Sequence, residues 1–322
     1  MDAVILAGGF GTRLRPWTDT VPKPLIPLLD MTLIEHTIRI LPRNTVQRVI
    51  IASGYGVKQK TAYFDDFDTG FEVLVVEEDQ PLGTGGAIAN CREHIRGSRA
   101  IVMNGDLITT VDVQDMLSHH VKSDSLVSIS LWPVEDPTRF GVADFDQKKG
   151  LIRRFQEKPS LEEAYSNLIN AGCYIIETSV IQGLSTEFHS MERDVFPGIA
   201  ESGRMGGYRY SGRFIDAGTP ASYLEAMVAA IEDNSFNIGG IVGTSWYADP
   251  KMSKKGIENS AVGMGCKLGD GIRVNRSAIL EGARIGENVH LDNCLIGRGS
   301  IVPANSRLVD MVIGFNQQYQ RK

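Results

Sequence analysis

The stretch Ala3-Val4-Ile5-Leu6-Ala7-Gly8-Gly9-Phe10-Gly11-Thr12-Arg13 (residues 3–13) sets the fold of this chain. Its apolar first half predicts a short buried strand over Ala3–Ala7. Glycines directly after such a strand let the backbone approach a ligand closely and offer N–H groups to phosphate oxygens. Arg13 adds a planar guanidinium that suits the same oxygens. The stretch therefore predicts a phosphate-binding loop after the first strand of an α/β sheet.

This loop matches neither of the two common phosphate-binding motifs. A dinucleotide-binding fingerprint needs a third glycine where this chain has Leu14, and a P-loop needs a lysine directly after its glycines. The next lysine, Lys23, stands in the segment Val21-Pro22-Lys23-Pro24 and adds a second positive charge. The loop must therefore bind phosphate in another way.

Downstream, short Val- and Ile-rich strands alternate with helices as far as residue 130. Apolar residues recur at helical spacing over 33–41 and 87–95, between the predicted strands. This alternation predicts a parallel sheet with helices on both faces. The further strands of this part are Val46–Ser53, Phe71–Glu77, Ala100–Asn104 and Leu126–Leu131.

Residues 140–215 have a different pattern, in which short strands are separated by turns. We expect an antiparallel extension of the sheet here, with strands Gly141–Phe145, Leu151–Phe155, Ala171–Ile176 and Gly206–Tyr210. Thr219-Pro220 then predicts the start of a helix through Tyr223–Ile231, since threonine caps helices and proline suits their first position. The predicted fold class is α/β, with a Rossmann-like mixed, mainly parallel sheet flanked by helices.

The C-terminal part carries a repeat of aliphatic residues six positions apart, with two slips of five. Such a period is typical of a hexapeptide β-helix, and it predicts a short left-handed parallel β-helix with about 18 residues per coil and about three coils over 257–315. The predicted domains are 1–235 (catalytic), 236–256 (linker) and 257–322 (β-helix). The repeated residues are Val262, Leu268, Val274, Leu280, Ile285, Leu291, Ile296, Val302 and Leu308.

Bulk composition excludes several classes of protein. The 322 residues are 42% hydrophobic and carry a net charge of -6, which gives no support for a nucleic-acid surface. The four cysteines lie far apart with no zinc-ligand spacing, so we expect reduced thiols. No apolar run approaches the roughly 20 residues that span a bilayer. We expect a soluble cytoplasmic protein.

Seven motifs in order make the chain resemble the sugar-1-phosphate nucleotidylyltransferases (nucleotide-sugar pyrophosphorylases). They extend over about residues 3–230, and a hexapeptide tail is a common appendage in that family. The motifs are Leu6-Ala7-Gly8-Gly9-x-Gly11-Thr12-Arg13-Leu14-x-Pro16 with Lys23-Pro24, Gln80-Pro81-Leu82-Gly83-Thr84-Gly85-Gly86-Ala87, Asn104-Gly105-Asp106, Phe140-Gly141-Val142, Glu157-Lys158-Pro159, Asn170-Ala171-Gly172 and Phe214-Ile215-Asp216-Ala217-Gly218.

The resemblance implies a reaction in which a sugar 1-phosphate attacks the α-phosphorus of an NTP and pyrophosphate leaves. Arg13, Lys23, Asp106 and Asp216 would be catalytic, and the two aspartates would bind Mg²⁺, a hard cation that prefers oxygen ligands. The nucleotide-binding residues would be Leu6, Ala7, Gly8, Gly9, Gly11, Thr12, Arg13, Gln80 and Gly85. The sugar-phosphate-binding residues would be Gly141, Glu157, Lys158, Asn170 and Gly172.

The substrate pair stays open at this point. The loop around Gln80 and the short tail look most like mannose-1-phosphate guanylyltransferases, which favours GTP and mannose 1-phosphate. The Gln80 amide can both donate and accept, so a thymidylyl- or uridylyltransferase of glucose 1-phosphate is the alternative. A non-catalytic regulatory subunit that binds nucleotide-sugar is the third reading.

Three smaller expectations complete the analysis of the sequence. The tail is expected to mediate homo-oligomerisation, because the open end of a coil stack needs covering. Arg15 is expected to be a solvated or loop-bracing residue. His119 and His120 are expected on an exposed helix face rather than in a metal site.

Overall fold

The computed structural model describes residues 1–320 and divides into two compact units. The sheet unit comprises Met1–Gly9 and Thr37–Phe214, and the coil unit comprises Phe10–His36 and Ile215–Lys322. Each unit is thus built from two separate segments of the chain, whereas the predicted domains follow one another along the sequence. The glycine loop itself passes from one unit to the other between Gly9 and Phe10.

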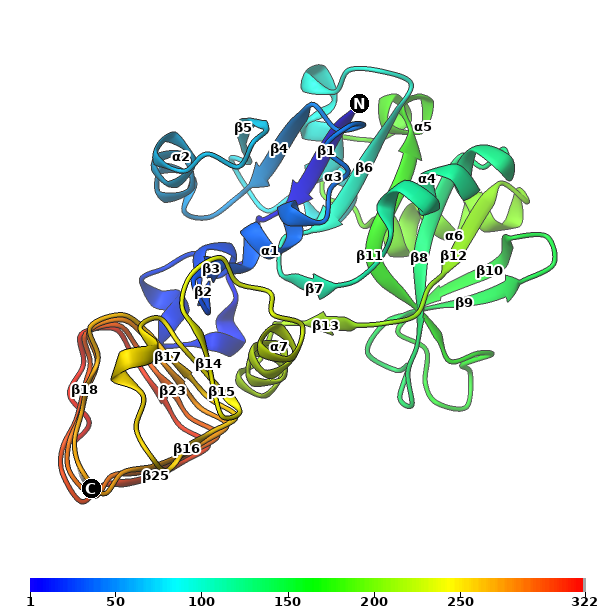
Figure 1. Cartoon of the computed structure of the whole chain (residues 1–322). Coiled ribbons are helices and arrows are strands. Elements are labelled where there is room, and N and C mark those ends of the chain that lie inside the picture. Colours follow the sequence, from blue (N-terminus) through cyan, green and yellow to red (C-terminus); the bar gives the residue numbers. More distant parts are fainter. Residues whose placement is uncertain (321–322) are drawn as a thin grey trace. The chain divides into compact units, whose positions relative to one another are not determined.

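The sheet unit is built on a nine-stranded mixed sheet (Figure 1). Every strand predicted in this part of the chain is present, with bounds that shift by a few residues. In spatial order the strands are β5 (Glu72–Glu77), β4 (Arg48–Ser53), β1 (Asp2–Leu6), β6 (Arg99–Asn104), β11 (Leu168–Glu177), β8 (Val127–Pro133), β12 (Met205–Arg209), β10 (Leu151–Glu157) and β9 (Gly141–Asp146).

The sheet is less parallel than predicted, because β11 lies between β6 and β8 and runs antiparallel to both. Parallel pairing is limited to β5–β4, β4–β1, β1–β6 and β8–β12. The alternating pattern before residue 130 does not reveal this insertion, because β11 comes some 40 residues later in the chain and looks locally like any other buried strand. The antiparallel extension itself is confirmed by β10, which pairs antiparallel with β9 and β12.

Helices cover both faces of this sheet, as predicted. The main apolar core packs helices α3 (Gly83–Asn90), α5 (Thr178–Gly183) and α6 (Phe196–Glu201) against one face, where Val4, Ile50 and Val102 point. Helix α4 (Val113–Lys122) lies against the other face, and α2 (Val57–Asp66) packs beside β5. The remaining short elements of this unit are β7 (Leu107–Thr109), the 3₁₀ turn η4 (Arg92–His94) and the π-helical turn η5 (Met191–Val195).

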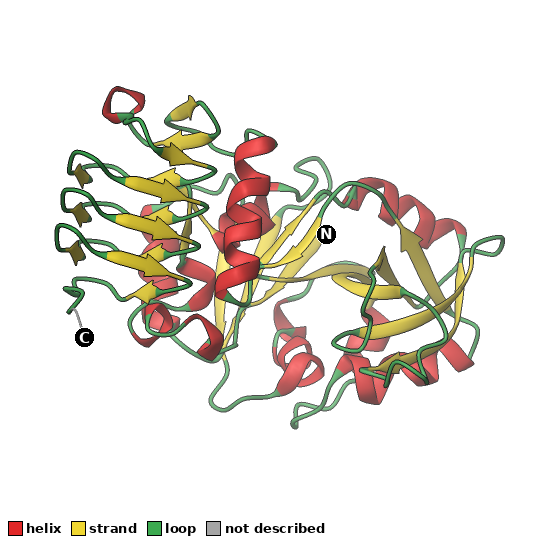
Figure 2. Cartoon of the chain, turned by 90° about the horizontal axis from the view of Figure 1, so that it is seen from below, coloured by secondary structure: helices red, strands yellow, loops and turns green. Residues whose placement is uncertain are grey.

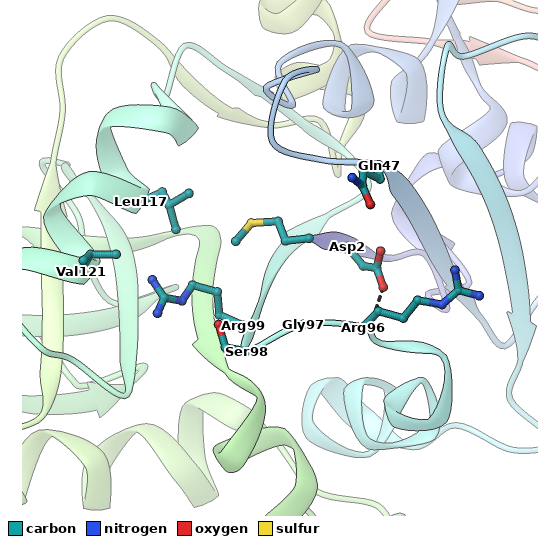
Figure 3. A pocket seen from close by; sticks show the side chains of 9 residues that line it. Asp2, Gln47, Arg96, Gly97, Ser98, Arg99, Leu117 and Val121 are labelled. Atoms are coloured by element: carbon teal, nitrogen blue, oxygen red, sulfur yellow. Dashed lines mark hydrogen bonds between the residues drawn. The ribbon is translucent and has the colours of Figure 1, made fainter.

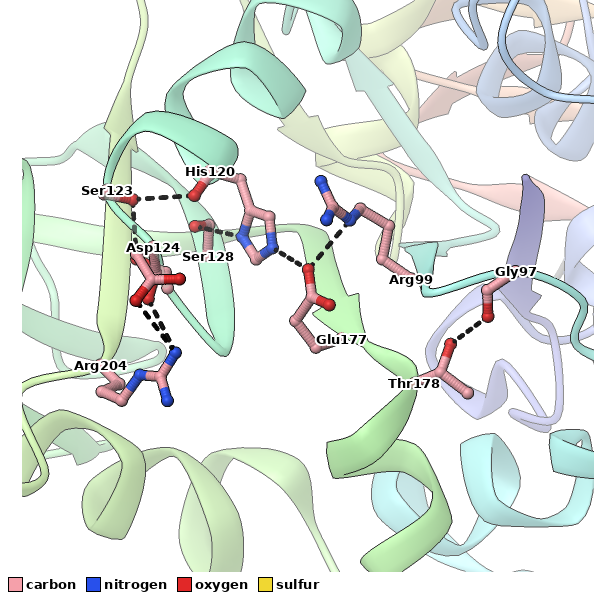
Figure 4. A network of polar contacts seen from close by, with 10 residues as sticks. Gly97, Arg99, His120, Ser123, Asp124, Ser128, Glu177, Thr178 and Arg204 are labelled. Carbon is pink, nitrogen blue, oxygen red and sulfur yellow. Dashed lines mark hydrogen bonds and ion pairs between the residues drawn. The ribbon is translucent and has the colours of Figure 1, made fainter.

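The predicted exposure of the two histidines on α4 is wrong for His120, which is 1% exposed. Val113, Met116 and His120 follow one another at helical spacing and turn the same face of α4 inward. The imidazole contacts the Ser128 hydroxyl at 2.8 Å and the Glu177 carboxylate at 3.0 Å, and Glu177 also pairs with Arg99 (Figure 4). Burial lowers the pKa of His120, while Glu177 opposes that shift.

The coil unit contains the predicted repeat as eleven short strands in three parallel sheets, visible as stacked rungs in Figure 2. The chain visits the three sheets in turn, which is compatible with a β-helix. The strands are β16 (Ile257–Glu258), β17 (Ala261–Val262), β18 (Lys267–Leu268), β19 (Arg273–Asn275), β20 (Ala278–Ile279), β21 (Arg284–Ile285), β22 (His290–Asp292), β23 (Leu295–Ile296), β24 (Ile301–Val302), β25 (Arg307–Val309) and β26 (Val312–Ile313).

Each coil has 17 residues rather than the predicted 18. Ile257 pairs with Val274 and Ala261 with Ala278, each 17 positions on. One of the three sides of a coil is therefore a residue shorter than a full hexapeptide. As a consequence Ile279, and not the predicted Leu280, stacks with Val262 in the interior of the coils.

The segment predicted as a linker, 236–256, carries ordered structure. β14 (Gly240–Val242) and β15 (Ser245–Tyr247) pair antiparallel, and β15 continues the sheet of β17. Trp246 and Tyr247 are buried. The other elements of this unit are β2 (Pro27–Leu28), β3 (Met31–Thr32), α7 (Pro220–Glu232) and the 3₁₀ turns η1 (Thr12–Leu14), η2 (Trp17–Asp19), η3 (Lys23–Leu25) and η6 (Pro250–Met252); α1 (Leu33–Arg39) and β13 (Phe214–Asp216) contain the points where the chain passes between the units.

Helix α7 begins as predicted. The hydroxyl of Thr219 accepts a hydrogen bond from the N–H of Ser222, and Ser222 caps Thr219 in return. Pro220 occupies the first helical position. Within residues 1–320, no helix is both long and apolar enough to cross a lipid bilayer.

The segment that follows the glycines is anchored on the coils by Trp17. The indole is fully buried, stacks on Phe315 and meets Tyr223 edge to face. Its N–H donates to the carbonyl of Ile313 at 2.8 Å. Because Trp17 stands only four residues after Arg13, the coils hold the arginine-bearing end of the loop in place.

We predict that Trp17→Ala lowers the free energy of unfolding by about 3–5 kcal/mol, the usual cost of removing a buried tryptophan. Trp17→Phe keeps an aromatic ring and loses the N–H donor, so it is expected to cost only about 1–3 kcal/mol. Urea unfolding of both variants measures the difference. Equal and small effects for the two would contradict the anchoring role.

Candidate functional site

The glycine loop lies at the carboxyl ends of the parallel strands, the edge where open α/β sheets bind ligands. Gly8 and Gly9 follow β1, Gln80 stands in the loop after β5, and Asp106 comes two residues after β6. The peptide N–H of Gly105 donates to the carbonyl of Leu6 at 3.0 Å, which keeps Asp106 beside the start of the loop. Gln80 is exposed and Asp106 is half-buried.

A cavity of about 520 Å³ opens at the opposite edge, at the amino ends of β1 and β6 (Figure 3). The Asp2 carboxylate in its wall accepts hydrogen bonds from Arg48 at 2.8 Å and from the N–H of Arg96 at 2.7 Å. The charge of this carboxylate is thus compensated within the fold. We therefore place the candidate site at the glycine loop and not in this cavity.

Lys60, which the sequence analysis missed, holds the glycine loop from below. Its side chain is completely buried, and its Nζ donates to the carbonyl of Ala7 at 2.7 Å, the hydroxyl of Ser53 at 2.7 Å and the carbonyl of Tyr55 at 2.6 Å. In a trans peptide the C=O and the following N–H point in opposite directions. By holding the Ala7 carbonyl, Lys60 therefore turns the N–H of Gly8 away from the protein core.

Glu78 lies beside the same loop. A Cβ added to Gly8 would come within 3.0 Å of its carboxylate, so a glycine is needed at this close approach. The carboxylate also accepts a 3.4 Å hydrogen bond from the N–H of Leu82. Burial raises the pKa of Glu78 and lowers the pKa of Lys60 to about 8, and each charge partly opposes the shift of the other.

In the coil unit, three of the predicted catalytic side chains converge on Gly218. A Cβ added to this glycine would lie 2.8 Å from Arg13 Nη2, 2.9 Å from Asp216 Oδ1 and 3.2 Å from Lys23 Nζ. Lys23 and Asp216 form an ion pair at 3.6 Å, in which the lysine is nearly buried and the aspartate half-exposed. Arg13 itself is exposed. The cluster presents two cations and a carboxylate around a position without a side chain.

Gly11 shapes the turn between the glycines and Arg13. Its φ of 63° lies in the left-handed region, which favours glycine. Its carbonyl accepts a hydrogen bond from the Thr18 hydroxyl at 2.9 Å, and a Cβ here would collide with Lys23. Arg15 forms an exposed ion pair with Asp19 at 3.0 Å, which confirms its expected loop-bracing role.

The predicted sugar-binding residues form two groups in the sheet unit. Gly141 pairs with Glu157 across β9 and β10, and Glu157 forms an ion pair with Lys158 at 3.1 Å. Asn170 and Gly172 belong to an irregular part of β11, where Gly172 has a φ of 69° and lies against the Asn104 side chain.

Gly85 has less freedom to contact a base than its motif suggests. Its N–H donates to the carbonyl of His189 at 3.0 Å, and a Cβ on Gly85 would overlap the His189 ring. A base contact through this N–H would require His189 to move. No local signal in the sequence indicates this approach, since His189 is more than 100 residues away from the loop.

Comparison with known proteins gives the family. The nucleotidyl transferase family model matches residues 2–233. The chain belongs to this family. It is 33% identical over 232 residues to mannose-1-phosphate guanylyltransferase 1 of Arabidopsis thaliana, covering 70% of this chain and 64% of that protein, so it spans slightly less than two thirds of this relative.

Two further relatives are informative. Mannose-1-phosphate guanylyltransferase of Mycobacterium tuberculosis is 32% identical over 284 residues, 85% of this chain and 78% of that one. The crystal structure of HddC from Yersinia pseudotuberculosis complexed with GMP-PN superposes with a TM-score of 0.59 at 30% identity, over 70% of this chain and 97% of HddC.

We predict that Lys60→Met raises the KM for the nucleotide about tenfold, because the Ala7 carbonyl loses a charged donor and the Ala7–Gly8 peptide can rotate. Lys58→Met, exposed on the same helix, is the matched control. In the wild type, the KM is also expected to rise above about pH 8, where the neutral amine has two N–H groups for three acceptors. A Lys60→Met variant with the KM and pH profile of the control would contradict this role.

Proposed function

We propose that this chain transfers a nucleotidyl group from an NTP to a sugar 1-phosphate, giving a nucleotide-sugar and pyrophosphate, and that GTP and mannose 1-phosphate are its substrates. The observation that carries the proposal is the cluster of Arg13, Lys23 and Asp216 around Gly218. Family membership and the guanylyltransferase relatives support it.

In the proposed reaction, a phosphate oxygen of the sugar 1-phosphate forms a bond to the α-phosphorus. The bond from the α-phosphorus to the bridging oxygen breaks, and its electron pair leaves with pyrophosphate. No side chain has to form a covalent intermediate, so positioning and charge stabilisation supply most of the rate. Arg13 would bind the departing pyrophosphate, and Lys23 would lie near the α-phosphate.

The backbone of Leu6–Gly9, Gly11 and Thr12 would hold the nucleotide, with the Gly8 N–H already turned outward by Lys60. Gln80 and Gly85 would lie near the base. Gly141 and Glu157 would bind the sugar, together with Asn170 and Gly172, and Lys158 would pair with the sugar phosphate.

We also propose Asp106 and Asp216 as ligands of Mg²⁺, whose charge would offset that of the phosphates. Carboxylate oxygens are the donors this cation prefers, and the two lysine and arginine charges beside Asp216 keep its carboxylate ionised enough to serve. Within residues 1–320, three or more His, Cys, Asp or Glu side chains do not gather in a metal-binding cluster. This suits a cation that also takes ligands from substrate phosphates and water.

Two other functions remain as outcomes of the test. The exposed amide of Gln80 favours the thymidylyl- or uridylyltransferase of glucose 1-phosphate, since it can both donate to and accept from a pyrimidine. A regulatory subunit would bind nucleotide-sugar without turnover. The presence of Arg13, Lys23, Asp106 and Asp216 argues for an enzyme.

The test is pyrophosphate release with Mg²⁺, crossing GTP, dTTP, UTP, ATP and CTP against mannose, glucose and N-acetylglucosamine 1-phosphates. A strong preference for GTP with mannose 1-phosphate would bear out the proposal. Preference for dTTP or UTP with glucose 1-phosphate would replace it by the alternative. Silence across all pairs, with nucleotide-sugar still bound, would favour the regulatory subunit.

We predict that Asp106→Ala reduces Mg²⁺-dependent turnover by about a hundredfold or more while the melting temperature stays near that of the wild type. Asp136→Ala, which removes a carboxylate from an exposed loop, is the control. Near-normal turnover in Asp106→Ala would refute the metal assignment.

We further propose that the tail is a left-handed β-helix through which the chain forms a homo-oligomer in the cytoplasm. Stacked coils end in strands with unpaired edges, which a second copy can cover. Size-exclusion chromatography with light scattering is expected to give a multiple of 35.3 kDa. A mass of one chain at micromolar concentration would refute self-association.

A further inference from the structure

A half-buried carboxylate, Glu192, lies between the loop around Thr84 and strand β11 of the sheet unit. It stands on the π-helical turn η5, a rare conformation that is frequent at functional sites. Its Oε2 accepts hydrogen bonds from the hydroxyls of Thr84 at 2.6 Å and Ser190 at 2.7 Å. Its Oε1 accepts one from the hydroxyl of Tyr174 at 3.2 Å. One side chain thus joins two segments that the family motifs assign to different substrates.

The carboxylate fixes the direction of every hydrogen bond around it. A carboxylate only accepts, so the hydroxyls of Thr84 and Tyr174 must both donate to it. Each hydroxyl oxygen is then left as an acceptor. Thr84 Oγ1 accepts from the N–H of Met191 at 2.9 Å, and the Tyr174 oxygen accepts from Asn170 Nδ2 at 3.0 Å.

This direction determines which way the Asn170 amide faces. Its Nδ2 donates to Tyr174, and its Oδ1 accepts from the N–H of Gly172 at 3.0 Å. With the amide turned round, its NH₂ group would face the Gly172 N–H, and two donors would oppose each other. The orientation shown is therefore the one that the Glu192 charge selects through Tyr174.

We infer that Glu192 is a positioning residue for the sugar-binding side chain Asn170, acting through Tyr174, and that it ties this side chain to the base loop at Thr84. The inference rests on the proposed function, which gives Asn170 to the sugar. The second N–H of Asn170 Nδ2 is then presented in a fixed direction to a sugar hydroxyl. Because a sugar hydroxyl is remote from the reacting phosphorus, this contact contributes equally to the ground state and the transition state.

Glu192→Gln tests the inference with almost no change in shape. If the new NH₂ group faces Tyr174, the Tyr174 proton turns toward Asn170, and the Asn170 amide must rotate against Gly172. If the NH₂ group faces the other way, it opposes the donors Thr84 and Ser190. We expect the KM for mannose 1-phosphate to rise about tenfold, the effect of losing a hydrogen bond to a charged group, with kcat within about twofold.

Two further variants make the test specific. Glu201→Gln makes the same charge change at an exposed position of α6 and is the matched control. Tyr174→Phe keeps the buried ring and removes the connecting hydroxyl, so it is expected to raise the same KM. The double variant Glu192→Gln with Tyr174→Phe is expected to be no worse than the poorer single one, since both interrupt one chain of hydrogen bonds.

The outcomes separate this inference from the proposed function. A wild type that turns over no NTP with any sugar 1-phosphate sinks the proposed function, and this inference with it. An active wild type whose KM for mannose 1-phosphate is unchanged in both Glu192→Gln and Tyr174→Phe overturns only the role of Glu192. A fall in melting temperature and in kcat with an unchanged KM would show a merely structural role and would overturn it as well.

Discussion

The opening loop depends on two buried donors, one in each unit of the chain. Lys60 Nζ holds the Ala7 carbonyl, just before the glycines, and Trp17 Nε1 holds the Ile313 carbonyl, just after Arg13. A glycine-rich segment is the most mobile kind of backbone, and ordering it costs conformational entropy. With both ends fixed in the folded protein, much of that cost is met before a nucleotide arrives, and the loop can offer its N–H groups and its guanidinium in set directions.

The same requirement explains the C-terminal coils in functional terms. Repeated coils form a rigid stack in which each strand pairs with the strand 17 residues away, so the position of Ile313 is set by the strands beneath it. A segment packed on this stack, with the Trp17 indole between Phe315 and Tyr223, shares its rigidity. The tail therefore supports the loop of its own chain, whatever association between chains it also mediates.

The sequence predicts those features that have a local signal. Hydrophobic periodicity and the Thr219-Pro220 cap predict the strands, the coils and α7, and ordered motifs predict the residues around Gly218. Features that arise only from tertiary packing were missed. Lys60 looks like any solvated lysine of a helix until the sheet covers it, and His120 becomes buried only because α4 turns it toward Ser128. The 17-residue coil was missed since a slip of one residue is invisible until strands pair.

Base and sugar recognition are connected in this account through buried polar groups rather than through the motif residues alone. Glu78 supports the glycine loop and the N–H of Leu82, and Glu192 supports Thr84 and, through Tyr174, Asn170. Such groups are costly to bury unless every hydrogen bond is made, and the same cost fixes a single arrangement. The motif residues that meet substrate can then be few and exposed.

The central claim is that this chain moves the α-phosphoryl group of a nucleotide onto a sugar phosphate. The most direct measurement follows the label of [α-³²P]GTP during incubation with mannose 1-phosphate and Mg²⁺. The account predicts that the label appears in GDP-mannose and that the pyrophosphate released is unlabelled. Label that stays in GTP, or appears in GDP or GMP without a nucleotide-sugar, would contradict it.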